Sequence, residues 1–153
     1  TTFRVGGFVG QNTGSITDSY SNNDVSGRSN LADSNFFGYS GGFVGENRST
    51  IERSYTVGDV TGVDPSNTSV IESAYDTGGF VGDNESTINN SYWDHESSTQ
   101  SSTNSVGQTD GGSNTIQALT TSEMSGPVAE TNMSGLNFND VWTTTSDYPE
   151  LQD

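Results

Sequence analysis

The chain contains three near-identical copies of one phrase, and this repeat restricts its fold more than any other feature. The copies read GGFVGQN, GGFVGEN and GGFVGDN and begin at residues 6, 41 and 78, so they are 35 and 37 residues apart. A second phrase recurs at the same two spacings, as residues 16–20, 51–55 and 88–92. Self-similarity at a fixed period of this size is typical of solenoids, in which stacked copies bury one continuous core.

Each phrase is too short for a helix and is typical of a β-strand. Phe, Val, Ile and Tyr favour strands, and clusters of Gly, Asn, Asp and Ser separate them. Parallel strands about 4.8 Å apart would place equivalent side chains directly above one another. We therefore predict ladders of equivalent residues, formed by Phe8, Phe43 and Phe80, by Ile16, Ile51 and Ile88, and by Tyr20, Tyr55 and Tyr92.

The polar letters of the phrase have predicted roles as well. The glycines are expected at corners with positive φ or where two backbones approach closely. The asparagines at 12, 47 and 84 are expected to shape the turns in a left-handed conformation or through hydrogen bonds, and to stack as an asparagine ladder.

These features predict an all-β protein with two parts. Residues 1–92 are expected to form a parallel β-solenoid (β-helix) of about three coils. Residues 93–153 are expected to form a polar loop followed by an irregular C-terminal cap packed on the solenoid. Within the cap, Thr120 and Thr121 ahead of Glu123 predict a short helix that begins near Thr121, and Gly126-Pro127 would end it.

The cap is expected to cover the open last coil, because unpaired strand edges promote aggregation. Its large apolar side chains include Phe138, Trp142 and Tyr148, whereas the N-terminal residues provide only Phe3 and Val5. We therefore expect the N-terminal coil edge to be the surface that meets partners, either further repeats of the same parent protein or a second copy.

The stretch GGFVGENRSTIERSYTVGDVTG resembles the GLUG repeat. That family's pattern runs Gly-Gly-Leu-x-Gly-x-Asn, Gly-x-Ile-x-x-Ser-Tyr and Gly-x-Val-x-Gly. This chain has Phe8, Phe43 and Phe80 where the pattern prefers leucine, and only the first unit keeps the glycine before isoleucine, as Gly14. The resemblance covers residues 5 to about 93, and the segment after it is similar to the one that closes many GLUG arrays. It implies a secreted or surface protein, such as a filamentous-haemagglutinin-like adhesin or an archaeal surface protein.

The charge of the chain limits its partners. There are 20 acidic and 4 basic residues, all four of them arginine, for a formal net charge of −16. Such a surface repels nucleic acid and anionic membranes. In molar salt the Debye length falls to about 3 Å, so dense carboxylates are tolerated. The composition favours a halophilic archaeon, with an acidic bacterial surface protein as the alternative.

Few residues are candidates for chemistry. The chain has no cysteine, and its single histidine, His95, stands beside Asp94 and Glu96 in a polar stretch typical of a surface loop. No catalytic motif is present, so we expect a protein that is not an enzyme and needs no cofactor. Calcium is the one ligand that the oxygen-rich segments favour, with Asp59, Asp64 and Asn67 as candidate ligands and Asp110 as a further oxygen donor.

The sequence therefore favours a non-catalytic extracellular or cell-surface module with a structural or adhesive role. Its partners would be protein or surface glycan, with no nucleic acid and no membrane insertion. The alternatives are a self-assembling filament subunit that stacks end to end and, third, a polysaccharide-processing β-helix enzyme. The chain begins within the pattern, so a fragment or a mature product is expected. Five tripeptides match the N-glycosylation pattern, at Asn47, Asn67, Asn84, Asn89 and Asn132.

Overall fold

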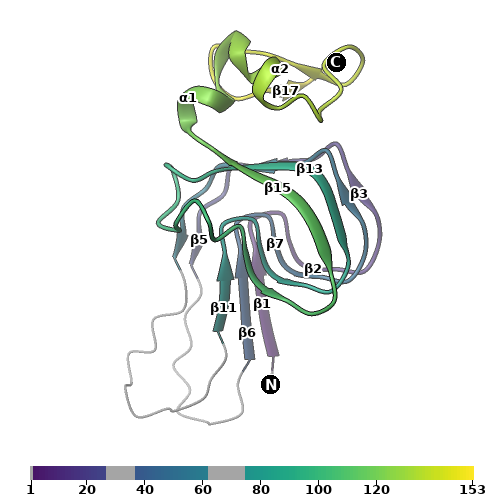
Figure 1. Cartoon of the computed structure of the whole chain (residues 1–153), viewed down its shortest axis with the longest axis vertical. Helices are drawn as coiled ribbons and strands as arrows, with labels where there is room; N and C mark the ends of the chain where they lie inside the picture. The colour runs from purple at the N-terminus through teal and green to yellow at the C-terminus, as the bar shows by residue number, and fades with distance from the viewer. Residues whose placement is uncertain (1, 27–36, 62–74) are drawn as a thin grey trace.

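The chain folds into stacked coils of β-strands, with a C-terminal tail (residues 120–153) packed on one side (Figure 1). The computed structural model describes residues 2–26, 37–61 and 75–153. The first coil holds β1 (Thr2–Gly6), β2 (Val9–Asn12), β3 (Ile16–Thr17), β4 (Tyr20–Ser21) and β5 (Val25–Ser26). The second holds β6 (Phe37–Gly41), β7 (Val44–Asn47), β8 (Ile51–Glu52), β9 (Tyr55–Thr56) and β10 (Val60–Thr61). The third holds β11 (Tyr75–Gly78), β12 (Val81–Asn84) and β13 (Thr87–Asp94), and a partial fourth holds β14 (Val106–Thr109) and β15 (Ser113–Leu119).

The coils pair in the register that the repeat spacing predicts. One sheet has the order β14-β12-β7-β2, with one strand from each coil, and all of its pairs are parallel. Val44 lies between Val9 and Val81, as the copied phrase requires. The isoleucine and tyrosine phrases pair in the same way in a second sheet. The predicted all-β parallel solenoid is therefore confirmed.

The polar loop predicted from residue 93 spans only residues 95–105 in the structure, because residues 106–119 form a fourth coil. β14 pairs with β12, so that Val106 lies beside Val81, and β15 pairs with β13. The stretch VGQTDGG keeps the Val-Gly of the repeat, but Ser105 stands where the repeat has phenylalanine. The solenoid strands thus continue to Leu119, well past residue 92.

The interior of the solenoid is built from the predicted ladders. The rings of Phe43 and Phe80 stack with centroids 5.0 Å apart, and Phe8 stacks on Phe43 at 4.9 Å. Ile51 and Ile88 are fully buried in the same cluster. Trp93 is the first residue of the segment predicted to form the loop and the cap (93–153). It lies instead inside the solenoid, at the position that Thr56 holds in the second coil.

Burial of the phenylalanine ladder is incomplete at its first member. Phe43 and Phe80 have no exposed surface, whereas Phe8 is 48% exposed. The difference follows from position, because Phe8 belongs to the first coil and has a coil on one side only. The stacking of the phenylalanines was therefore predicted correctly, but the first member of the ladder is not buried.

The asparagine ladder is continuous across the first three coils. The side-chain amide of Asn12 donates to Oδ1 of Asn47 at 2.8 Å, and that of Asn47 donates to Oδ1 of Asn84 at 2.9 Å. Each Oδ1 also accepts a backbone N–H two residues further on. None of these asparagines has a positive φ, so the ladder and its turn hydrogen bonds define their role.

The repeat glycines are required by close backbone packing. A Cβ on Gly41 would lie 2.1 Å from the carbonyl oxygen of Val44, which is too close for any residue with a side chain. Of the two roles expected for these glycines, close backbone approach is the one observed, and none of them has a positive φ. The left-handed corners of the coils belong instead to three equivalent non-glycine residues, Asp18, Arg53 and Asn90. At this corner the chain turns, so that Ile51 packs in the interior and Tyr55 in the cluster shared with the tail.

The tail begins with the helix that the sequence predicts and packs on the tyrosine ladder. Thr120 caps α1 (Thr121–Met124), and Glu123 completes a capping box with it. The tail continues through η1 (Gly126–Val128), α2 (Ala129–Asn132), β16 (Trp142–Thr143) and β17 (Glu150–Leu151). Its side chains Met124, Met133 and Trp142 are buried against the tyrosines of three coils. No helix in the described part of the chain is long and apolar enough to span a membrane.

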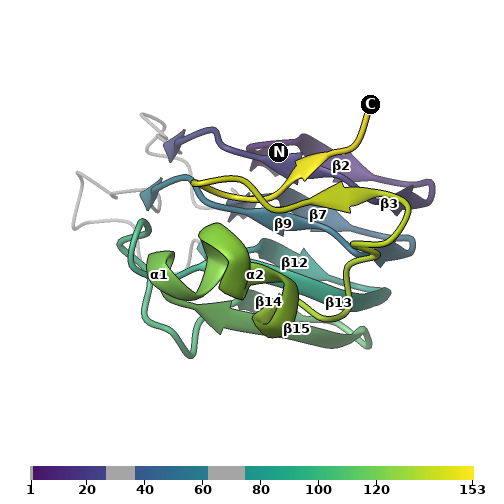
Figure 2. The ribbon, with the colours of Figure 1, turned by 90° about the horizontal axis from the view of Figure 1, so that it is seen from above.

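The predicted position of the cap at the end of the stack is therefore wrong. The tail lies across the side of the coils, as the view in Figure 2 shows. The physical reason is that the tyrosine rings leave an apolar surface along the stack. The ring of Trp142 lies 5.6 Å from that of Tyr55 and 6.0 Å from that of Tyr20. Among the described strands, β2 and β14 stand at opposite edges of their sheet, so both ends of the stack are open.

We predict that truncation of the central ladder phenylalanine is much more destabilising than truncation of the terminal one. Phe43→Ala removes a ring packed between two others, and should lower the free energy of unfolding by about 3–5 kcal/mol. Phe8→Ala removes a ring that is 48% exposed, and should lower it by less than half as much. Chemical denaturation of both variants checks this. Equal losses would contradict the stacked arrangement.

Candidate functional site

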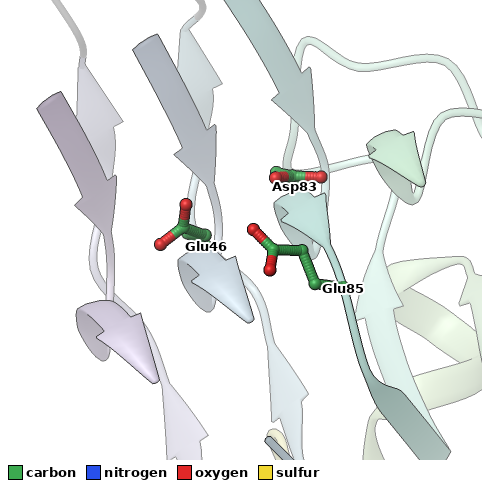
Figure 3. Close-up of side chains that lie close together, drawn as sticks. All are labelled: Glu46, Asp83 and Glu85. Atoms are coloured by element: carbon green, nitrogen blue, oxygen red, sulfur yellow. The ribbon is translucent and has the colours of Figure 1, made fainter. Parts of the chain in front are cut away.

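One position varies in the repeated phrase GGFVG(Q/E/D)N, and the side chains at this position form a column across the coils. Gln11 pairs with Glu46, Glu46 with Asp83, and Asp83 with Gln108. This column places two acidic residues in neighbouring strands of one sheet. Figure 3 shows these two, together with Glu85 two residues beyond Asp83. The column is the candidate functional site.

The second-coil position of the column is fully compensated. Glu46 is 1% exposed, and its Oε2 accepts a hydrogen bond from Nε of Arg4 at 2.6 Å. Nη2 of Arg48 lies 3.2 Å from Oε1, and Nε2 of Gln11 donates to Oε2. Two guanidinium groups and one amide therefore surround this buried carboxylate, as burial of a charge requires.

The third-coil position has no such compensation. Asp83 is 0% exposed, and neither of its carboxylate oxygens has a hydrogen-bond partner among the described residues. Desolvation, reinforced by neighbouring acids, raises the pKa of Asp83 to about 6. Those acids, in order of effect, are Asp110, Glu85, Glu46 and Asp76.

The acidic side chains of this region lie close enough to share a cation. One carboxylate oxygen from each of Glu46, Asp83 and Glu85 lies within 4.8 Å of the other two. Carboxylate oxygens are the ligands that hard cations prefer. Arg48 also approaches the cluster, with Nη2 3.1 Å from Oε1 of Glu85, but its side chain is 45% exposed.

Of the three sequence-predicted calcium ligands, the structure describes Asp59 alone. Asp64 and Asn67 are outside the described residues. Asp59 accepts hydrogen bonds from the backbone N–H of Thr99 at 2.9 Å and from the hydroxyl of Thr61 at 3.2 Å, so it ties the loop after β13 to β10. Asp110 does lie near the acidic column, since its charge contributes to the raised pKa of Asp83.

Two of the five predicted glycosylation sites are wrong. Asn47 and Asn84 are 0% exposed, because the asparagine of these two tripeptides is the ladder residue. Asn89 and Asn132 are partly exposed, and Asn67 lies outside the described residues.

The segment around His95 serves the packing of the tail. Oδ2 of Asp94 accepts hydrogen bonds from the hydroxyls of Thr121 and Tyr148, both at 2.6 Å, and so joins the third coil to the tail. His95 lies edge-on to Trp93, with ring centroids 6.3 Å apart. The carboxylate of Glu96 accepts from the backbone N–H of Thr121.

Comparison with known proteins places the repeat in a described class. Residues 1–26 match the model of a family described as the GLUG motif, which covers the first coil. Over 48 residues the chain is 50% identical to Halomucin from Haloquadratum walsbyi. That stretch is 31% of this chain and, to the nearest per cent, 0% of Halomucin, so this chain spans only a minute part of its relative. No solved structure matches the chain. The resemblance to GLUG repeats is confirmed by these matches.

We predict that Asp83 makes the metal-free protein less stable as the pH rises from about 4 to about 6. The folded-state pKa is about 6 and the ordinary value is 3.8, so the folded state holds the proton more tightly. The stabilisation that comes from this tighter proton binding is complete below the ordinary pKa of 3.8. It is lost as the pH rises through about 6. Thermal melts in a chelator should show a flatter profile for Asp83→Asn in this range. An unchanged profile would show that Asp83 titrates normally.

Proposed function

Because the chain carries GLUG repeats, we propose that it is a non-catalytic structural or adhesive module of a cell-surface protein in a halophile. The GLUG match and the similarity to Halomucin suggest a surface-type protein of this kind. In this proposal the module spaces or presents other parts of a larger extracellular protein, and its partners are protein or surface glycan.

The observation that carries the proposal is that the repeated side chains are used to hold the coils together. The phenylalanines stack on their copies, the asparagines bond to their copies, and the tyrosines anchor the tail. In an enzyme, one set of groups is placed once around a substrate. Equivalent side chains that stack or form hydrogen bonds along one axis support the interpretation of the module as a rod-like building unit.

The charge supports the halophilic part of the proposal. At a formal net charge of −16, self-repulsion opposes the compact state in dilute salt. Molar salt screens exposed charges separated by more than about 3 Å. The acidic surface is therefore compatible with high salt, as it is in the alternative of an acidic bacterial surface protein.

The proposal is tested by epitope accessibility on whole cells. The parent protein, tagged within this module, would be produced in a haloarchaeal host, and an antibody applied to intact and to lysed cells. We expect the tag to be detected on intact cells, with a cytoplasmic marker detected only after lysis. Detection of the tag only after lysis would overturn the surface assignment.

A second candidate function, end-to-end assembly, is favoured by the open first coil. Phe8 leaves 48% of its surface exposed above Phe43, and β2 is an edge strand of its sheet. Another coil in the same register could cover this ring and pair with this edge. The end of a second copy would provide such a coil.

We predict that Phe8→Asp weakens any self-association of the module. Sedimentation velocity over a range of concentrations, in high salt, would measure it. Phe37→Asp is the matched control, because Phe37 is equally exposed at 49% but lies in β6, between β1 and β11. Equal effects of the two variants, or a monomer at all concentrations, would exclude assembly through the first coil.

A further inference from the structure

The acidic column contains two equivalent positions with opposite surroundings. In the second coil, Arg4 and Arg48 neutralise Glu46, and Gln11 donates a hydrogen bond to it. The register of the coils identifies the three residues that hold the same places around Asp83. Tyr39 replaces Arg4, Glu46 replaces Gln11, and Glu85 replaces Arg48. One carboxylate therefore has two cations beside it, and its equivalent in the next coil has two further acids and a phenol.

This substitution leaves a buried carboxylate without a partner. Asp83 is 0% exposed and both of its oxygens lack hydrogen-bond donors among the described residues. Burial of an unpaired charge is strongly unfavourable, and proteins avoid it by protonating the group or by supplying a cation. Asp83 shares its surroundings with Glu46 and Glu85, whose carboxylate oxygens lie within 4.8 Å. The local charge therefore attracts cations.

We propose that a calcium ion binds between the second and third coils, held by carboxylate oxygens of Asp83 and Glu85 with Glu46 at its edge. The ion would take the place beside Asp83 that arginines take beside Glu46. This proposal concerns residues that the surface function does not use, and it stands or falls independently of that function.

The general coordination preferences of the two ions favour calcium over magnesium. Ligands on opposite sides of Ca²⁺ are about 4.6–5.2 Å apart, because each lies at 2.3–2.6 Å. The three carboxylate oxygens fit within such a span. Mg²⁺ binds at about 2.0–2.1 Å with strict octahedral geometry and dehydrates reluctantly. Waters would complete the shell of six to eight oxygens that Ca²⁺ accepts.

Arg48 is the competitor that the ion must displace in part. Its Nη2 lies 3.2 Å from Oε1 of Glu46 and 3.1 Å from Oε1 of Glu85. In the described part of the chain it forms no hydrogen bond with Asp83, although the charge of Asp83 contributes to raising the pKa of Arg48. The side chain is 45% exposed, so it can turn toward water at little cost. Glu46 keeps its bond to Arg4 in that case. We therefore expect modest affinity, with a Kd on the order of 10⁻⁴–10⁻³ M, as in other extracellular calcium modules.

The test is a calcium titration of the whole chain in about 1 M NaCl, where diffuse binding to surface carboxylates is screened. Metal-free protein would be titrated with CaCl₂ by calorimetry, and its melting temperature followed in parallel. We expect one saturable site and a rise in melting temperature. Asp83→Asn should weaken binding at least about tenfold and abolish the rise. Asp153→Asn, which removes the same charge from an exposed residue of the tail, should change neither.

A second variant recreates the second-coil arrangement in the third coil. Glu85→Arg places a guanidinium where Arg48 stands relative to Glu46, so the protein should fold without calcium and no longer respond to it. This variant keeps the proposal falsifiable if Asp83→Asn is poorly folded. Equal binding by wild type, Asp83→Asn and Glu85→Arg would overturn the proposal, as would the lack of a saturable site in wild type. Equal affinity for Mg²⁺ would overturn the assignment to calcium.

Discussion

In-register parallel pairing is the constraint on which the rest of the structure depends. Because each strand pairs with its copy one coil away, every residue of a repeat lies beside its equivalent. Apolar residues benefit directly, as the phenylalanine ladder shows. Asparagine also benefits, because its side chain is both donor and acceptor and can bond to an identical neighbour. The residues that are identical in all three copies of the phrase are those that can pack against, or form hydrogen bonds with, an identical residue.

Charged residues repel their own copies, and at two positions the chain places opposite charges in neighbouring coils, although Asp24 and Asp59 repeat the same acid. At the left-handed corner, Asp18 of the first coil forms a two-bonded ion pair with Arg53 of the second. Arg48 and Glu85 hold equivalent positions and form another pair between coils. The Arg53 guanidinium holds the pKa of Asp18 below its usual range. Asp83 departs from this pattern, since it meets Glu46 and Glu85 where an alternating scheme would place cations.

The parts of the fold that the sequence predicts are those that occur more than once. Ile51, Tyr55 and Asn47 each have copies at fixed spacing, and the copies reveal both the pairing and the register. The fourth coil escaped prediction because Ser105 replaces the ladder phenylalanine. The docking of the tail escaped it because Trp142 and Met133 occur once, so no copy indicates their partner. The acidic column could be recognised in the sequence as the one variable position of the repeated phrase. Its electrostatic surroundings could not, because they depend on Arg4 and Tyr39, which the register of the coils places beside it.

Because the tail lies along the side of the stack, it holds the coils together but does not cover the ends of the stack. The tail covers the tyrosine ladder of three coils and bonds to them through Asp94, Tyr55 and Asp18. It thereby fixes the coils to one another without closing either end of the stack. The edge strands at both ends remain able to pair with further strands. In addition to the tail, contacts within each interface hold neighbouring coils together. The ion pair of Arg4 with Glu46 contributes to this cohesion between the first two coils, and the next interface has an unpaired carboxylate in the equivalent place.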